Sequence, residues 1–185
     1  MKRLYTVLIF SGLIFTSVLA GWWLNELNLH RISRYLGVPG AMFIIASLIY
    51  SLSKRDLISP GRSRPTLRLH QLFGGLGGMV LLAHGGFYFN ALLPSVAFFV
   101  LLVVLVSGLI VRLILTGIKS EMKDAGAALV SQGLNPEQAA REIHLKALED
   151  PRVLKWRRVH TPASAVLLAL ALLHIITIFA LWGWN

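Results

Sequence analysis

The sequence predicts an all-α fold, an integral membrane helical bundle with five transmembrane helices. Three observations support this prediction. The chain of 185 residues is 56% hydrophobic and only 14% charged, whereas a soluble domain usually has about 25% charged residues. Its apolar residues gather in five long stretches, and a membrane span needs roughly 20 such residues. The basic residues lie mostly between these stretches. We therefore expect residues 1–185 to form one transmembrane bundle.

The five predicted spans cover about residues 4–24, 36–52, 67–90, 92–117 and 159–184. The first also resembles a signal peptide, because Lys2 and Arg3 precede an apolar run that ends in small residues near Ala20. We expect this segment to be retained as a helix. The second span is short but free of charge. Tryptophans at the ends of the first and fifth spans predict an interfacial aromatic belt: Trp22, Trp23, Trp182 and Trp184.

Residues 119–150, between the fourth and fifth spans, form a polar segment that is predicted to be largely helical. Asn135, Pro136 and Gln138 have the spacing of a helix cap, a first-turn proline and a capping-box glutamine. This helix is expected to run to about Glu149 and to stop before Pro151. The segment is either a docking surface for a partner or an amphipathic lid that lies on the membrane.

The basic residues predict how the bundle is oriented in the membrane. Of the 18 lysines and arginines, only Arg31 and Arg34 belong to the side opposite the N-terminus. The positive-inside rule therefore places the N-terminus and residues 119–150 in the cytoplasm and the C-terminus outside. We expect the inner (cytoplasmic) membrane as the location. The net charge of +10 is then explained by topology and anionic lipid, and no nucleic acid partner is expected.

Several classes of site are excluded by the residues that the sequence contains. Cysteine is absent, which excludes disulfides, cysteine-ligated iron–sulfur clusters, thiolate zinc sites and thioether-attached c-type haem. The sequence has no HExxH motif and no phosphate-binding glycine loop. The glycines at 74–78 lie within a predicted helix rather than between a strand and a helix. Any haem must therefore be held without covalent bonds to its ring.

Four histidines within the predicted spans are paired by their spacing. His70 and His84 are fourteen residues apart in the third span, and His160 and His174 are fourteen apart in the fifth. Fourteen residues are close to four helical turns, so both members of a pair share a face and lie ~21 Å apart along the axis. The predicted topology makes these two helices parallel. His70 should therefore face His160 at one depth, and His84 should face His174 at the other.

This pattern predicts two b-type haems with the four histidines as axial ligands of the iron. Ionisable side chains inside a bilayer are costly and usually functional. Two neutral imidazoles saturate a haem iron, which suits electron transfer better than oxygen binding. The alternative is that the four are packing or helix-end histidines. His30 and His144 lie outside the predicted spans and are expected to be ordinary loop histidines.

Glycines and arginines near these histidines are the other predicted haem contacts. Gly77 is midway between His70 and His84, and its small size allows either a macrocycle or another helix to come close. Arginines bind carboxylates in a bidentate fork and are candidates for the haem propionates, unless they only mark topology or snorkel to lipid. Arg112 is the strongest of these because it lies inside a span. The full set is Gly74, Gly77, Gly78, Arg68, Arg112, Arg157, Arg158 and Arg34.

The stretches from Leu67 to Gly86 and from Trp156 to His174 resemble those of the membrane di-haem cytochromes b. They are similar to the transmembrane domain of ferric reductases and NADPH oxidases, and to the four-helix core of cytochrome b in quinol-oxidising complexes. The resemblance implies two b haems and electron transfer across the membrane. No flavin or NAD(P)H domain is expected after the fifth span, so it further implies that electrons are exchanged with quinone or quinol and with other redox subunits.

The expected function is that of a di-haem subunit that carries electrons between the membrane quinone pool and a partner redox protein, rather than that of a complete enzyme. One alternative is a stand-alone transmembrane reductase of ferric iron or another oxidant. A second alternative, from a different class, is a haem-free structural or assembly subunit of a membrane complex. A transporter is disfavoured, because no carboxylate lies inside any predicted span and the sequence has no inverted repeat.

Overall fold

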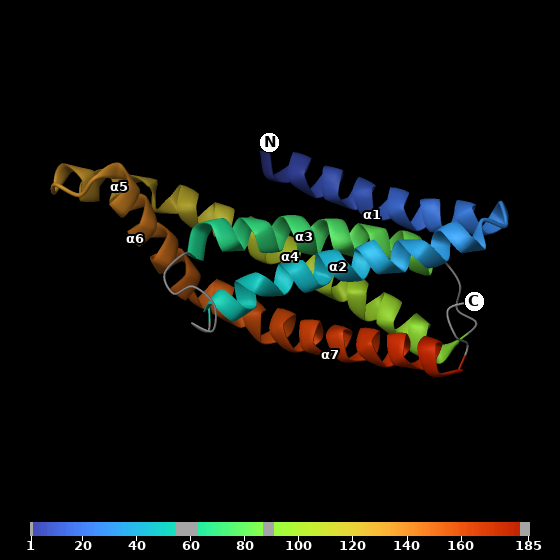
Figure 1. The fold of residues 1–185 in the computed structure, drawn as a ribbon. Helices are drawn as coiled ribbons and strands as arrows, with labels where there is room; N and C mark the ends of the chain where they lie inside the picture. Colours follow the sequence, from blue (N-terminus) through green and yellow to red (C-terminus); the bar gives the residue numbers. More distant parts are fainter. Residues whose placement is uncertain (1, 55–62, 87–90, 182–185) are drawn as a thin grey trace.

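The computed structural model of the protein describes residues 2–54, 63–86 and 91–181, and nearly all of these residues are helical (Figure 1). The described helices are α1 (Lys2–Glu26), α2 (His30–Lys54), α3 (Ser63–Gly85), α4 (Leu92–Glu121), α5 (Lys123–Ser131), α6 (Pro136–Glu149) and α7 (Pro151–Leu181). The predicted all-α fold is confirmed for this part of the chain. The predicted turn near Asn90 and the tryptophans Trp182 and Trp184 lie outside the described residues.

Two helices begin before the predicted membrane spans, and the prediction of His30 as a loop histidine was wrong. Helix α2 begins at His30, six residues before the predicted span, because no proline or glycine interrupts the chain before Gly37. His30 is therefore the first residue of a helix. Helix α7 begins at Pro151 rather than near residue 159. There the Asp150 carboxylate accepts a hydrogen bond from the backbone N–H of Arg152 at 2.8 Å, as a helix-capping residue does.

The polar segment after α4 folds as a helical hairpin. The predicted capping box is present at α6, because the Asn135 side chain accepts from the Gln138 backbone N–H at 2.8 Å and the Gln138 side chain accepts from the Asn135 N–H at 3.3 Å. Helix α6 ends at Glu149, as predicted. Gly133 joins α5 to α6 with a φ of +100°, a conformation that glycine adopts without strain.

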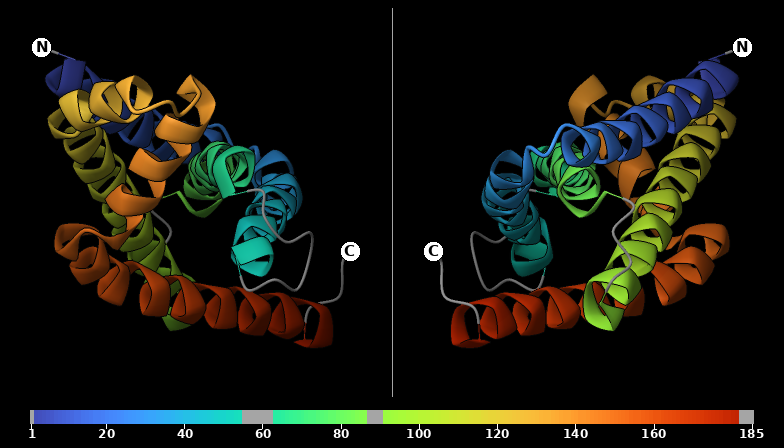
Figure 2. Two further views of the ribbon diagram at one scale, coloured as in Figure 1. Left: turned by 90° about the vertical axis from the view of Figure 1, so that its left-hand side faces the viewer. Right: turned by 90° about the vertical axis from the view of Figure 1, so that its right-hand side faces the viewer.

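The helices alternate in direction. Helices α1, α3 and α7 run one way and α2 and α4 run the other, with α5 and α6 beyond the end of the bundle where α3 begins (Figure 1). The predicted parallel direction of the two histidine-bearing helices is confirmed. Helix α2 packs along α3, α4 packs along α7, and α1 contacts α3 on its other side (Figure 2).

Helices α3 and α7 do not pack directly on one another. Among the described residues, none of α3 has its Cα within 8 Å of a Cα of α7. Helices in direct contact have axes about 8–10 Å apart, which brings many Cα atoms closer than that. Helices α3 and α7 therefore face each other across a wider separation, whereas α3 and α4 are in direct contact.

Two apolar clusters hold these helices in place. The first contains Leu82 of α3, Phe98, Leu101 and Leu105 of α4, and Leu167 of α7. The second contains Leu115 and Ile118 of α4, Ala147 of α6 and Val153 of α7. Arg152 adds an ion pair across the same junction, with Glu121 Oε2 at 2.8 Å and Asp150 Oδ1 at 3.0 Å. The start of α7 is therefore tied to the end of α4.

His144 was predicted to be an ordinary loop histidine, and this prediction was wrong. It lies on α6, and only 2% of its surface is exposed. The amphipathic turn of α6 directs it inward, together with Ala139 and Ala147, toward the neighbouring helices.

Three described helices are long and apolar enough to cross a membrane: α1 from Leu4 to Glu26, α4 and α7. Their apolar surface is largely exposed, since only 6% of the most apolar window of α1 and of α7 is buried within the protein. A membrane protein is the natural interpretation, because lipid would cover that surface. Spans in α2 and α3, and the orientation in the membrane, remain predictions.

Candidate functional site: two histidine couples

The four paired histidines meet across the separation between α3 and α7. The imidazole rings of His70 and His160, the first couple, have centroids 6.3 Å apart and planes inclined by 87°. The rings of His84 and His174, the second couple, have centroids 6.5 Å apart and planes inclined by 62°. All four side chains are half-buried. The structure thus brings together the same two couples that the fourteen-residue spacing pairs.

Helix α2 fixes both histidines of α3 through backbone carbonyl groups. His70 Nδ1 lies 3.0 Å from the carbonyl oxygen of Ser47, and His84 Nδ1 lies 2.8 Å from that of Ser33. Ser33 and Ser47 are themselves fourteen residues apart, so an antiparallel α2 offers an acceptor at each histidine level. The hydroxyl of Ser33 also donates to the His84 carbonyl oxygen at 3.0 Å.

Helix α4 fixes His160 through a side chain. The Ser107 hydroxyl lies 2.7 Å from His160 Nδ1 and donates its own proton to the Val104 carbonyl oxygen at 2.9 Å. Because the Ser107 hydroxyl proton is donated to the Val104 carbonyl oxygen, the Ser107 oxygen accepts the hydrogen bond from His160 Nδ1–H. Ser107 is buried, with 3% of its surface exposed.

These contacts select one tautomer for three of the four rings. A carbonyl oxygen only accepts, and Ser107 accepts here, so the proton of His70, His84 and His160 resides on Nδ1. The lone pair of each neutral ring is then on Nε2. In metal-bound histidines the other ring nitrogen usually donates a hydrogen bond, which fixes the ring orientation and raises the basicity of the ligating nitrogen.

Two glycines make room for the rings, and neither was predicted from the sequence. A Cβ on Gly37 of α2 would lie 3.0 Å from His84 Cε1 and 3.2 Å from both of its ring nitrogens. A Cβ on Gly108 of α4 would lie 3.7 Å from His160 Cε1. The signal that could have found them is position, since Gly37 lies one helical turn after Ser33 and Gly108 follows Ser107.

The predicted haem-contact glycines lie at helix–helix contacts. Gly77 faces α2, where an added Cβ would lie 2.9 Å from Phe43 Cβ and 3.0 Å from the Gly40 carbonyl oxygen. An added Cβ on Gly74 would lie 3.8 Å from Ser47 Cβ of α2, and one on Gly78 would lie 2.5 Å from Leu105 Cδ2 of α4. The helix-contact interpretation of these glycines is confirmed, and their approach to a macrocycle remains a prediction.

The arginines predicted to bind propionates fall into different places. Arg68 and Arg112 line one groove beside α5 and α6. Arg157 is half-buried on α7, three residues before His160, whereas Arg158 is exposed. Arg34 is exposed on α2, next to Ser33 and therefore near the level of the second couple. Among the arginines outside the groove, Arg157 is half-buried near the first couple, and Arg34 lies near the level of the second couple.

The couples suit an iron that brings most of its own ligands. Within residues 2–54, 63–86 and 91–181, no three His, Cys, Asp or Glu side chains converge as a protein-only metal site requires. Metal–imidazole bonds are about 2.0–2.1 Å long and the ring centroid lies roughly 1 Å behind the nitrogen, so two imidazoles on opposite sides of one metal have centroids about 6 Å apart. The observed separations of 6.3 and 6.5 Å fit this arrangement.

Comparisons with protein-family models, with curated protein sequences and with solved structures found no match to this chain.

Proposed function

We propose that the protein is a di-haem b-type cytochrome subunit of a membrane redox complex. It would carry electrons across the bilayer between the quinone pool and a partner redox protein. His70 and His160 would be the axial ligands of one haem iron, and His84 and His174 those of the other. When bound, each haem supplies reversible one-electron chemistry, while the protein supplies ligands, orientation and electrostatics.

The observation that supports the proposal best is the repetition of one arrangement at two levels. Each couple joins α3 to α7 at nearly the same ring separation, 6.3 and 6.5 Å. Edge-to-face packing of two rings also falls within about 4.5–7 Å. The Cα atoms of the two helices, however, stay more than 8 Å apart among the described residues, so the helices do not pack directly on one another. A flat ligand between the rings accounts for both the separation and the pairing.

The Nδ1 hydrogen bonds support the same proposal. Three of the four rings are held with the lone pair on Nε2, which is the state that binds iron. The neighbours that hold them come from α2 and α4 and not from the opposite member of the couple. Each of these three rings is therefore preorganised by its own helix pair, which lowers the cost of ordering it when the cofactor binds.

In this proposal all five long helices span the membrane, with the N-terminus and the α5–α6 hairpin in the cytoplasm. The couple of His70 and His160 is then near the cytoplasmic surface, and the couple of His84 and His174 is near the outer surface. Arg157 and Arg34 are the proposed propionate partners at these two levels. The quinone pool and other redox subunits are the proposed donor and acceptor, and the inner membrane is the proposed location.

The experiment that tests the proposal counts haems in variants of the full chain. Purified protein should give a b-type reduced-minus-oxidised spectrum with about two haems per chain. His84→Ala should retain one haem and lose electron flow to the outer partner. His30→Ala is the matched control, because His30 is exposed at the start of α2, and it should retain both. Two haems in His84→Ala would refute the pairing.

A turnover assay with quinol and ferric chelates then separates two electron-transfer roles. Reduction of the chelate by the isolated chain would identify a stand-alone reductase. Reduction only in the presence of a co-purified partner would identify a subunit. A folded preparation that never binds haem would leave the structural or assembly role.

A further inference from the structure

The end of the bundle next to α5 and α6 carries a second feature, an open groove with a volume of about 1080 Å³. It is bounded by the first turns of α3, the last three turns of α4, and the α5–α6 hairpin. This places it beside the first histidine couple, but its lining residues include none of the four paired histidines. The groove is therefore distinct from the proposed haem sites.

The groove is strongly cationic. Four of its lining side chains are basic, namely Arg68, Arg112, Lys119 and Lys123, and none is acidic. The carboxylates of Glu121 and Asp150 bind Arg152 at the start of α7. Like charges gathered in this way repel one another unless an anion lies between them. The charge of the groove therefore selects a negatively charged ligand.

The same groove has an apolar wall that remains uncovered. Leu69 and Leu72 of α3 line it and are 43% and 54% exposed, and Val130 of α5 is 42% exposed. Leu115 lines it from α4 and is buried. A small inorganic anion would satisfy the arginines but would leave this wall in water. A ligand with an anionic head and long apolar chains matches both surfaces.

We infer that this groove binds one anionic phospholipid. Arg68 and Arg112 contact its phosphate, Lys119 and Lys123 add positive charge, and the acyl chains cover Leu69 and Leu72. Basic pockets between transmembrane helices on the cytoplasmic side are suited to anionic lipid headgroups. The position of Arg112 within the apolar helix α4 also requires an anion or an aqueous route, because an arginine in hydrocarbon is costly.

Lipid binding in the groove does not depend on bound haem. It also explains why the basic residues of the groove lie on helices next to the couple of His70 and His160. A lipid held there would bridge α3, α4 and the hairpin. It would stabilise the junction by mass action, as any ligand of the folded state does. The bound lipid should therefore raise the thermal midpoint of the full chain.

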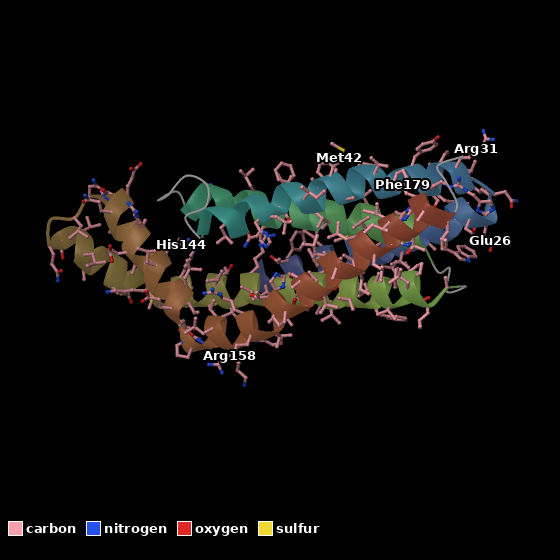
Figure 3. The ribbon with its side chains drawn as sticks, turned by 60° about the horizontal axis from the view of Figure 1, so that its bottom comes forward. Glu26, Arg31, Met42, His144, Arg158 and Phe179 are labelled. Carbon is pink, nitrogen blue, oxygen red and sulfur yellow. The ribbon has the colours of Figure 1, made fainter. Side chains whose placement is uncertain are left out.

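The test measures lipid retention by native mass spectrometry on the full chain in detergent, with added dioleoyl phosphatidylglycerol. Wild-type protein should retain one lipid, and the variant R68Q/R112Q should bind about tenfold more weakly, since each basic residue contributes several-fold to anionic-lipid affinity. The matched control is K155Q/R158Q, which removes the same charge from exposed positions of α7. Arg158 points away from the bundle and neither residue lines the groove (Figure 3), so the control should bind as wild type.

Four outcomes would overturn the inference. Equal weakening in both double variants would show general attraction to positive charge, and equal retention of dioleoyl phosphatidylcholine would show that anionic charge is not recognised. Displacement by millimolar inorganic phosphate would identify a phosphate site, and displacement by a glutamate-rich peptide would identify a protein-docking site.

If R68Q/R112Q does not fold, Lys123→Gln gives the decisive measurement. It should weaken phosphatidylglycerol binding several-fold, and unchanged binding would refute the site.

Discussion

Ser107→Ala tests how the fold prepares its histidines for a ligand. The substitution removes the oxygen that accepts from His160 Nδ1–H at 2.7 Å and changes little else, because the Ser107 side chain is small and buried. A buried donor without its acceptor costs about 1–3 kcal/mol. Loss of the hydrogen-bond partner of a metal-bound histidine lowers metal affinity roughly 10–100-fold, which corresponds to the same range of free energy. We therefore expect one haem to bind about tenfold more weakly or worse.

The assay is a haem titration of the cofactor-depleted full chain, followed by absorbance, with a redox titration of the loaded protein. Ser107→Ala should weaken one of two binding phases and shift one of two midpoint potentials. Ser107→Thr keeps the hydroxyl and should restore both. Ser95→Ala is the control on the same helix, because the Ser95 hydroxyl only donates to the Ala91 carbonyl oxygen. Wild-type affinities and potentials in Ser107→Ala would refute the role of this hydrogen bond.

Three further predictions follow from close contacts and charge. Gly37→Val should abolish binding at the second couple, because even a Cβ there approaches the imidazole to 3.0 Å, whereas Gly75→Val, with nothing within 4 Å, should retain two haems. Gly21→Ala should lower stability by about 1–3 kcal/mol through overpacking against α3, while Gly12→Ala, with open space around it, should not. Hydrogen bonds from Arg152 lower the pKa of Asp150, so this carboxylate stabilises the fold above its ordinary pKa of about 3.9. Asp150→Asn should lower the melting temperature at pH 7, with the difference from wild type vanishing as pH falls below that value.

A specific result would contradict each of these three predictions. Equal haem content in Gly37→Val and wild type would show that the ring does not depend on that glycine. Equal melting temperatures of the Gly21→Ala and Gly12→Ala variants would contradict the close packing of α1 on α3. A constant difference between Asp150→Asn and wild type from pH 7 to pH 2 would show that the Asp150 charge is not responsible.

The sequence allowed the long helices, their directions and the pairing of the four histidines to be predicted, because helical periodicity fixes which residues share a face. The cap at Asn135 was equally local and was predicted correctly. The starts of α2 at His30 and of α7 at Pro151 were not predicted. An apolar stretch shows where lipid would cover a helix, but it does not show where the helical hydrogen bonds begin.

The parts of the site that were not predicted come from tertiary packing. The register of α2 against α3 determines which carbonyl groups reach the α3 histidines, and no single helix encodes that register. It places the Ser47 carbonyl at His70 and the Ser33 carbonyl at His84. The burial of His144 likewise depends on where α6 folds back. The function of Gly77 was left open between two interpretations for the same reason, since its neighbours are known only once α2 is placed beside α3.

The most direct test of the central claim is a pyridine-haemochrome determination on the purified full chain, combined with circular dichroism to verify the helical fold. We expect about two b-type haems per folded chain, with low-spin spectra typical of two imidazole ligands. A helical, monodisperse protein that contains no haem and does not take it up when haem is added would contradict it.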